Sequence, residues 1–451
     1  MNRREVLYRT GAGLTATAFA GCGDDAENSS PSTPARSTPN PPTEPEVFDR
    51  FERVIDVTDR GADPSGEDSL LSTLVDIDPD GTLVYLPEGR YRIDDSWSVE
   101  GFERFGIYGP EATIVPDPGT DAQLFQLDGR DRGEELHLEG ISFDYSKDGA
   151  SGRMFNAQAR DGLLVRDVSA EGTVDRGPSL ARVDVTTADG SGLVDELRLP
   201  DGAEAGTGIT GCYVGNNSRG SITFKNCQIS GFPDNGLYAD PPMGRIVVDG
   251  GSFQNSGIAN VRVRGGSLVQ NVYVRCDDRH REFDNMRGIR LTDYEPQPDS
   301  EPAVVRNCYV DMLDATYSDG AIELSSQLAR GIVRSTTVRV DADDVIAVRA
   351  KSPSSAFLKA GVDTSLQVSD LVVRGDATGL EAIRVVERDG SHLDRIDVRQ
   401  PARGRDGVEF RRCVDGSLTD ARVEVGGRPL VLTESDVVRR NVDLSFPTDM
   451  V

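Results

Sequence analysis

The sequence contains very little lysine, histidine and tryptophan. Of its 49 basic residues only four are lysines, and it has three histidines and a single tryptophan, Trp97. Acidic residues number 76, which gives a formal net charge of −27. Such a surface repels the phosphates of nucleic acids, so we exclude nucleic acid as a partner. It also repels acidic polysaccharides unless cations or a local basic patch intervene.

The scarcity of lysine beside abundant aspartate and glutamate resembles the proteins of salt-loving archaea. At molar salt the screening length falls to about 3 Å, so repulsion across such a surface is weak. A GC-rich genome also replaces lysine by arginine and is the alternative explanation. We expect a halophilic, haloarchaeal protein.

Several motifs that carry chemistry are also missing. There is no H-E-x-x-H, no phosphate-binding loop and no G-x-S-x-G. None of the six cysteines forms a C-x-x-C pair, which argues against a zinc knuckle. Cys227 and Cys308 take equivalent places in the repeat described below, and we interpret them as small buried apolar residues, with a disulfide as the alternative. His137 and His392 lie in strand-like stretches, where we expect structural roles.

Residues 1–22 (MNRREVLYRTGAGLTATAFAGC) form a predicted export signal. Arg3 and Arg4 make a twin-arginine pair, and the apolar stretch that follows is too short to span a membrane. The last four residues resemble a lipobox, so we expect export by the twin-arginine pathway and a lipid anchor on Cys22 at the extracellular face of the cell membrane. Residues 23–46 are rich in proline, serine, threonine and aspartate, which predicts a disordered tether.

After residue 200 the chain repeats a unit of two short alternating strands joined by a polar pair, whereas residues 100–200 are less regular but are assigned to the same solenoid. Equivalent positions from Phe224 to Leu418 are separated by 24, 21, 36, 28, 35, 25 and 25 residues, so the base period is near 24. A third short strand lies between successive units. Three strands per period predict a β-helix, whereas the signatures of leucine-rich and propeller repeats are absent. The polar pairs contain Asn226, Asn271, Asn307, Asp370 and Asp420, which tolerate the left-handed backbone of a sharp turn.

The segment 54–93, with GADPSG followed by DGTLVYLPEGRYRI, resembles the N-terminal cap of pectate-lyase-like β-helix proteins. In that superfamily a short helix covers the open end of the solenoid, and here we expect it over about residues 67–76. Repeat and resemblance together predict an all-β fold, a single-stranded right-handed parallel β-helix over residues 47–451. Its ends need cover, which we assign to an N-terminal cap at 47–93 and a C-terminal cap at 430–451.

The third strand of each unit is the candidate functional surface. Side chains that face the same way stack from coil to coil, because strands alternate with period two. The result is a mixed row of carboxylates, guanidiniums and tyrosine, which carbohydrate grooves need; a plain solvated face is the alternative. We predict binding residues Tyr238, Asp240, Arg262, Arg264, Tyr294 and Arg349, and catalytic residues Arg290, Asp293, Glu323, Lys351 and His280.

Two insertions adjoin the strand 288–293 and could wall a groove near Arg290. One covers residues 276–284 and the other residues 293–302. Long loops on a rigid scaffold often carry function. His280, in the first insertion, is by type the candidate for proton transfer.

Two further resemblances concern the reaction. Calcium-dependent pectate lyases use clustered aspartates and a catalytic arginine, which implies Asp240, Asp293 and Glu323 as ligands of a possible Ca²⁺ and Arg290 as the arginine. The segment Arg349-Ala350-Lys351-Ser352 resembles the Lys-Ser strand of alginate-lyase and chondroitinase-type enzymes. The G-H-G element of polygalacturonases is missing. We therefore expect a membrane-anchored lyase of extracellular polysaccharide, with a non-catalytic glycan-binding or an adhesive, structural surface protein as alternatives.

Overall fold

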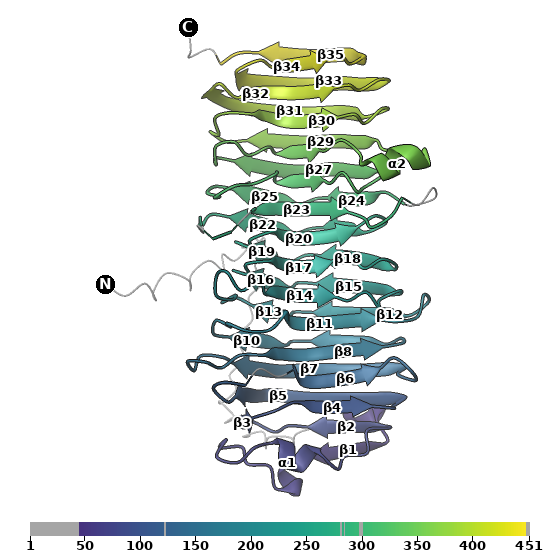
Figure 1. The fold of residues 1–451 in the computed structure, drawn as a ribbon, viewed down its shortest axis with the longest axis vertical. Helices are drawn as coiled ribbons and strands as arrows, with labels where there is room; N and C mark the ends of the chain where they lie inside the picture. Colours follow the sequence, from purple (N-terminus) through teal and green to yellow (C-terminus); the bar gives the residue numbers. More distant parts are fainter. Residues whose placement is uncertain (1–44, 121–122, 280–281, 284, 297–300, 448–451) are drawn as a thin grey trace, which may run out of the picture. The chain divides into compact units, whose positions relative to one another are not determined.

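A computed structural model describes residues 45–120, 123–279, 282–283, 285–296 and 301–447. The chain divides into two units, residues 1–45 and 46–451, and the second is a stack of parallel β-strands (Figure 1). The fold is thus the predicted parallel β-solenoid with very little helix. The predicted signal with Cys22, residues 23–44 of the predicted tether, and His280 lie outside the described residues. No helix in the described ranges is long and apolar enough to cross a membrane.

One sheet forms a complete face of the solenoid. Within the described residues it has 13 strands, each paired in parallel with the copies above and below it. Figure 1 shows several of them, such as β11, β14 and β17, stacked one above another. In chain order they are β4 (Trp97–Glu100), β6 (Gln123–Gly129), β8 (Arg153–Ala159), β11 (Ser179–Val185), β14 (Thr210–Val214), β17 (Asn235–Ala239), β20 (Ala259–Arg264), β23 (Arg287–Thr292), β26 (Ile322–Leu324), β28 (Val348–Ala350), β30 (Glu381–Val386), β32 (Asp406–Arg411) and β34 (Leu430–Thr433).

The second sheet, with 22 strands in the described part of the chain, folds around a corner and makes two faces. Seven long strands run through both faces, so β5 pairs with both β2 and β3, and β27 with both β24 and β25. They are β5 (Arg104–Pro116), β7 (Glu135–Asp144), β27 (Gly331–Val340), β29 (Leu366–Arg374), β31 (His392–Arg403), β33 (Gly416–Gly426) and β35 (Val437–Ser445).

Elsewhere each face has short strands of its own. The first face contains β1 (Arg53–Asp56), β2 (Thr82–Tyr85), β9 (Leu163–Arg166), β12 (Ser191–Asp195), β15 (Ser221–Lys225), β18 (Arg245–Asp249), β21 (Leu268–Gln270) and β24 (Ala303–Arg306). The second contains β3 (Gly89–Ile93), β10 (Ser169–Glu171), β13 (Arg198–Leu199), β16 (Gln228–Ser230), β19 (Ser252–Gln254), β22 (Tyr273–Cys276) and β25 (Tyr309–Met312).

The corner between these two faces is made by the polar pairs that the sequence shows. A residue with left-handed backbone turns the chain there, and φ is +52° at Asn226 and +58° at Asn271. Asparagine amides also join neighbouring coils: Asn307 donates to the side-chain oxygen of Asn271 at 2.6 Å. The expectation of left-handed backbone is confirmed at all five predicted positions, which also include Asn307, Asp370 and Asp420.

The interior is filled by stacked apolar side chains from all three faces. The five cysteines of the described residues, Cys227 and Cys308 among them, are buried and free, so the interpretation as small apolar residues holds and the disulfide alternative is wrong. Burial raises the pKa of the Cys276 thiol to about 12, which keeps it protonated and unreactive. The core therefore positions the outer surfaces without contributing chemistry of its own.

The ends of the stack differ from each other. At the N-terminal end a short helix, α1 (Leu71–Leu74), lies within the predicted stretch 67–76 and buries Leu74. Two 3-10 turns, η1 (Phe48–Arg50) and η2 (Thr58–Arg60), precede it. At the other end β34 and β35 add one more coil, whose side chains are mostly half-buried or exposed. The remaining helix, α2 (Ser355–Ala360), was not predicted and follows β28.

Two arginines are fully buried and bind backbone rather than carboxylates. Arg388 donates to the carbonyl oxygens of five residues at 2.8–3.1 Å, among them Ser325 and Thr364 from neighbouring coils. Arg405 donates to the carbonyls of Val345 and Gly379, both at 2.8 Å. Burial lowers the pKa of each guanidinium to about 10. These arginines tie the loops of successive coils together.

Candidate functional site

The outer surface of the 13-stranded sheet carries one continuous row of side chains. Register places Tyr238 beside Arg262, Arg262 beside Arg290, and Arg290 beside Glu323 on successive strands. Neighbouring strands lie about 4.8 Å apart, so each side chain contacts the next. The sequence predicted this stacking. We call the row the outer ladder; in chain order it is Asn156, Arg182, Tyr213, Tyr238, Arg262, Arg290, Glu323, Arg349, Arg384 and Glu409.

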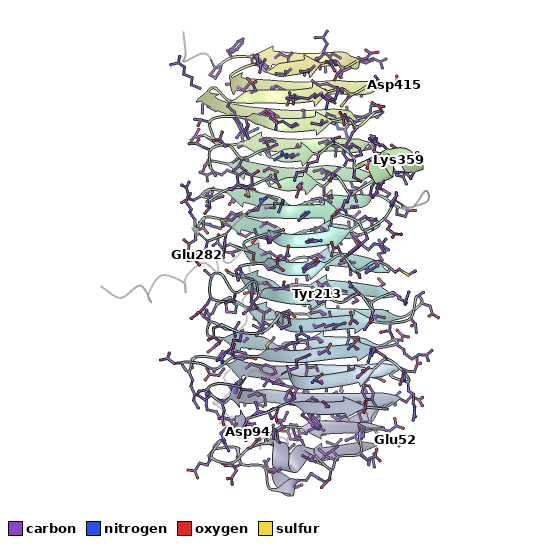
Figure 2. The ribbon with its side chains drawn as sticks, viewed as in Figure 1. Glu52, Asp94, Tyr213, Glu282, Lys359 and Asp415 are labelled. Atoms are coloured by element: carbon purple, nitrogen blue, oxygen red, sulfur yellow. The ribbon has the colours of Figure 1, made fainter. Side chains whose placement is uncertain are left out.

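Two tyrosines form the aromatic part of the outer ladder. The ring centres of Tyr213 and Tyr238 are 5.3 Å apart and their planes are inclined by 77°. The guanidinium carbon of Arg182 lies 5.8 Å from the centre of the Tyr213 ring, and that of Arg262 lies 4.1 Å from the Tyr238 ring. Figure 2 marks Tyr213 near the middle of the stack. We call this Arg-Tyr-Tyr-Arg set the tyrosine platform.

A buried aspartate holds each arginine of the platform. The Nε atom of Arg262 donates to Asp240 at 2.7 Å, and Nη2 of Arg182 donates to Asp184 at 2.7 Å. Burial raises the pKa of both carboxyls to about 6, against the opposing effect of the neighbouring arginine. A carboxyl that titrates near pH 6 beside an exposed surface is suited to proton transfer.

Gly215 explains how Arg182 reaches its position. The glycine lies in the coil between Asp184 and Asp240, next to β14. A Cβ atom there would lie 2.4 Å from a guanidinium nitrogen of Arg182 and 2.7 Å from the carboxylate of Asp184. A larger residue would therefore displace the side chains of this ion pair from their present positions.

The sequence predicted only one half of the platform. Tyr238, Asp240 and Arg262 were expected, whereas Arg182 and Tyr213 were not. Both residues precede Ser221, where the regular repeat begins, so their strands were not aligned with the later repeats. The alternating stretches of β11 and β14 have the same burial pattern as β17, and this signal would have found them.

Asp293 and Tyr294, which follow β23, differ in their burial and in their partners. Tyr294 is 43% exposed, and its side chain lies beside that of Tyr238, so it extends the platform. Asp293 is buried and pairs with Arg264 at 3.5 Å. Arg264 also donates to the carbonyl of Gly244 at 3.1 Å, on the side that leads to the 22-stranded sheet. The structure thus brings Tyr294 to the outer ladder but assigns Arg264 and Asp293 to each other.

Further along the outer ladder, towards its C-terminal end, lies a buried network of charges centred on Glu323. Nζ of Lys351 is 2.7 Å from one carboxylate oxygen of Glu323, and Nε of Arg290 is 3.6 Å from the other. Arg287 also forms an ion pair with Glu323. Within the described residues Glu323 accepts no well-aligned hydrogen bond, so charge alone holds this carboxylate in place. Three of the predicted catalytic residues, Arg290, Glu323 and Lys351, therefore meet here.

Asp319 completes the network from the turn that precedes β26. It binds Nζ of Lys351 and Nη1 of Arg349, each at 2.7 Å, and it also pairs with Arg287. Burial opposes its ionisation, but the hydrogen bond from Lys351 and the charge of Arg287 outweigh burial and lower the pKa of Asp319. Neither Asp319 nor Arg287 was among the predicted site residues. Asp319 lies in a turn, outside any alternating strand.

Geometry does not favour a metal at the three carboxylates proposed for Ca²⁺. Asp240 pairs with Arg262, Asp293 with Arg264, and Glu323 with Arg287 and Lys351. Among the described residues no group of three or more His, Cys, Asp or Glu side chains lies close enough to hold a metal ion. Each carboxylate already faces a protein cation, so these residues do not fit a Ca²⁺ site and we derive no step through one.

Neither described histidine belongs to the outer ladder. His137, in β7, is buried, and its Nε2 atom lies 2.9 Å from Glu135. Burial, followed by the charge of Arg50, lowers its pKa to about 4. His392, in β31, lies 2.8 Å through Nδ1 from the hydroxyl of Ser417. Both lie in strands of the 22-stranded sheet, as expected for structural residues.

The solved structures that resemble this chain are β-helix proteins from several functional classes. The catalytic domain of a GH87 alpha-1,3-glucanase superposes with a TM-score of 0.52 at 13% identity, covering 89% of this chain and 71% of that one. The Streptococcus pneumoniae surface protein and adhesin PfbA gives 0.49 at 14% identity, covering 87% of this chain and 100% of that one. The A-module of an Azotobacter vinelandii mannuronan C-5 epimerase, AlgE6, gives 0.39 at 14%, covering 87% and 99%.

The likeness to the glucanase domain shows the fold alone, and a fold does not determine a function. No family model matches the sequence, and a search of curated proteins finds no match. A role for this chain must therefore be argued from its own side chains.

Proposed function

We propose that this protein binds an extracellular polysaccharide along the outer ladder. The observation that carries the proposal is the tyrosine platform, in which Tyr213 and Tyr238 lie 5.3 Å apart between two arginines. Aromatic rings offer a surface for the apolar faces of sugars, and guanidiniums offer several donors for their oxygens. Because the ladder runs through many coils, it suits a long chain rather than a small molecule.

The outside location is part of the same proposal. It rests on the twin-arginine pair, Arg3 and Arg4, and on Cys22 as the site of lipidation. A lipid anchor on Cys22 with residues 23–46 as a tether would hold the solenoid at the cell surface. Polysaccharides outside the cell would then reach the ladder directly.

Cleavage by β-elimination is the second candidate, and the raised pKa of Asp240 favours it. With a pKa of about 6, Asp240 is ionised at neutral pH and still basic enough to accept a proton. The proton would leave the carbon next to the uronate carboxyl, a carbon–carbon double bond would form, and the glycosidic carbon–oxygen bond would break. The leaving oxygen would take its proton from Tyr294 or water.

In this reaction Arg262 and Arg290 flank the carboxyl of the substrate. Lys351 and Glu323 form an ion pair at 2.7 Å, so we assign them a structural role in the part of the ladder next to the platform. The sequence-based prediction instead made Lys351 a catalytic candidate. Variants can distinguish the catalytic role from the structural one.

The test is to incubate the full chain with neutral and acidic polysaccharides at high salt. Binding is read by co-sedimentation, elimination by the ultraviolet absorbance of the unsaturated uronide, and hydrolysis by new reducing ends. We expect binding of at least one polysaccharide. A rise in absorbance that Asp240→Asn and Arg290→Ala abolish supports elimination at the platform. If only Lys351→Ala abolishes the rise, the reaction belongs to the charge network around Glu323. No binding and no cleavage of any substrate would contradict the proposal.

A further inference from the structure

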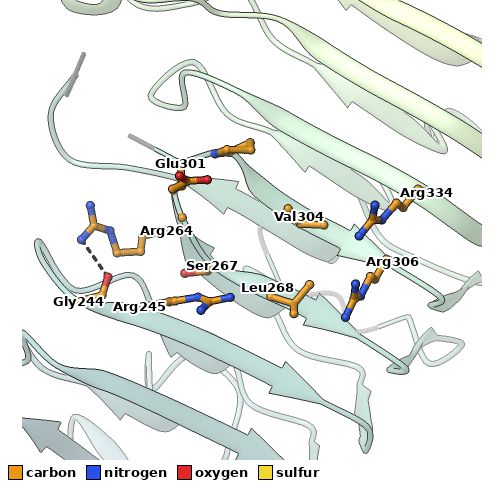
Figure 3. Close-up of a pocket in the computed structure, with 12 residues that line it drawn as sticks. Gly244, Arg245, Arg264, Ser267, Leu268, Glu301, Val304, Arg306 and Arg334 are labelled. Carbon is orange, nitrogen blue, oxygen red and sulfur yellow. Dashed lines mark hydrogen bonds between the residues drawn. The ribbon is translucent and has the colours of Figure 1, made fainter. Parts of the chain in front are cut away.

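A hollow lined by arginines lies outside the outer ladder, on the first face of the 22-stranded sheet. Its volume is about 750 Å³, and β18, β21, β24 and β27 contribute side chains to it. Figure 3 shows Arg306 and Arg334 on one side, Arg264 on the opposite side, and Arg245 between them. Four arginines face this space, and Glu301 is the one acidic residue among the described residues that line it, although the chain as a whole carries a charge of −27. We call it the arginine hollow.

Two of these arginines repel each other. Arg306 and Arg334 are register partners on adjacent strands, and like charges in that position are destabilising. Arg306 donates to the side-chain oxygen of Gln270 at 2.7 Å, and within the described ranges neither arginine forms an ion pair. The neighbours Arg349 and Arg384 on the other sheet are both neutralised by carboxylates. An anion is the partner that Arg306 and Arg334 lack.

The other two arginines leave donors unused. Arg264 is only 7% exposed, yet its Nε atom has no hydrogen-bond partner in the described part of the chain. Buried donors are normally satisfied, so this Nε atom can still take an acceptor. Arg245 also forms no ion pair with any described residue. Donors from both sides of the hollow are thus available to one bound group.

The floor of the hollow is apolar. Leu268 and Val304 are register partners, half-buried, and both line the space between the arginines. A volume of about 750 Å³ lies within the range of small-molecule sites. An apolar floor with cations at the rim matches a sugar ring that carries an oxyanion, since the ring face packs on the floor and the anion meets the guanidiniums.

We propose that the arginine hollow binds the carboxylate or sulfate group of an acidic polysaccharide. This goes beyond the proposed function, because it adds a second site with its own ligand chemistry on a different face. It also explains how a protein of charge −27 can hold a polyanion: the local basic patch provides attraction that the rest of the surface lacks.

The experiment is calorimetric titration of the full chain at constant ionic strength. The probes are inorganic sulfate, a uronate hexasaccharide and a sulfated hexasaccharide. The test variant is the double substitution Arg306→Gln/Arg334→Gln. The control is Arg395→Gln/Arg422→Gln, which removes the same charge from exposed arginines elsewhere on the same sheet. A second comparison uses Tyr213→Ala/Tyr238→Ala, which removes the rings of the platform.

We expect saturable binding of at least one acidic hexasaccharide, weakened at least about 10-fold by the hollow variant and unchanged in the control. Inorganic sulfate should compete with it. Binding of sulfate alone, no binding of any probe, or an equal loss in the control would overturn the assignment. If the tyrosine variant abolishes binding and the hollow variant does not, the acidic ligand belongs to the outer ladder; the proposed function then stands and this inference fails.

Discussion

The guanidinium of Arg262 lies over the ring of Tyr238, with 4.1 Å between the guanidinium carbon and the ring centre. The same group donates through Nε to Asp240 at 2.7 Å. Arg262 thereby connects an aromatic surface, which a sugar can contact, to a buried carboxyl that titrates near neutral pH. The affinity of the platform for a polysaccharide should therefore depend on whether Asp240 is protonated.

Asp240 should make stability depend on pH in a defined direction. Its pKa is about 6 in the folded protein against an ordinary value of 3.8 for aspartate, so between these pH values the folded state binds more protons than the unfolded state. The contribution of Asp240 is then fully present below pH 3.8 and is lost as pH rises through about 6. The free energy of unfolding of the wild type minus that of Asp240→Asn should fall by roughly 3 kcal/mol across this window, measured by urea unfolding.

Asp63 provides a control with the opposite sign. Hydrogen bonds from Ser65 lower the pKa of its exposed carboxyl to about 2. Asp63 therefore contributes stability above pH 3.8 that is lost as pH falls through about 2, so the difference between wild type and Asp63→Asn should grow with rising pH. If the difference in unfolding free energy between wild type and variant changed equally with pH for both substitutions, the burial of Asp240 would not be the cause of that change.

The network around Glu323 should be a strong source of stability. Glu323→Gln leaves Arg287 and Lys351 without the buried charge that both contact, and breaking such a pair costs about 3 kcal/mol or more. The matched control is Glu103→Gln, since Glu103 is 68% exposed and lies 4.0 Å from Arg132. That pair should contribute less than about 1 kcal/mol. Similar urea midpoints for both variants would contradict a cooperative network.

Arg388 should matter more for stability than its position in a loop suggests. Arg388→Met leaves five carbonyl oxygens without their donor, and we expect a loss of about 3–5 kcal/mol. Arg395→Met removes an exposed arginine that pairs with Asp370 at 2.7 Å, so its loss should stay below about 1 kcal/mol. Thermal unfolding of both variants measures the difference, and equal melting temperatures would refute a structural role for Arg388.

The sequence predicted those parts of the structure that depend on periodicity. Alternation with period two, repeated about every 24 residues, was enough to place Tyr238, Arg262, Arg290 and Glu323 in one row. The left-handed corner at Asn226 followed from the same repeat, because asparagine tolerates that backbone.

Features outside the strands could not be predicted in this way. Asp319 lies in a turn, and Asp293 follows the end of β23, where alternation no longer fixes the direction of a side chain. In the sequence Arg388 looks like an exposed loop residue. The carbonyl oxygens that surround it come from other coils and are brought together only when the coils pack. Arg182 and Tyr213 lie before Ser221, where the regular repeat begins, and were therefore not aligned with the later coils.

The most direct test measures the affinity of the full chain for the polysaccharide that it binds. Two double variants are compared, each of which replaces a different pair of tyrosines. Tyr273 and Tyr309 are a matched pair on the other sheet, with ring centres 6.0 Å apart. Tyr213→Ala/Tyr238→Ala should weaken binding about 10-fold or more, whereas Tyr273→Ala/Tyr309→Ala should leave the dissociation constant unchanged. Equal affinities for the wild type and the Tyr213→Ala/Tyr238→Ala variant would contradict the assignment of the outer ladder as the glycan-binding surface.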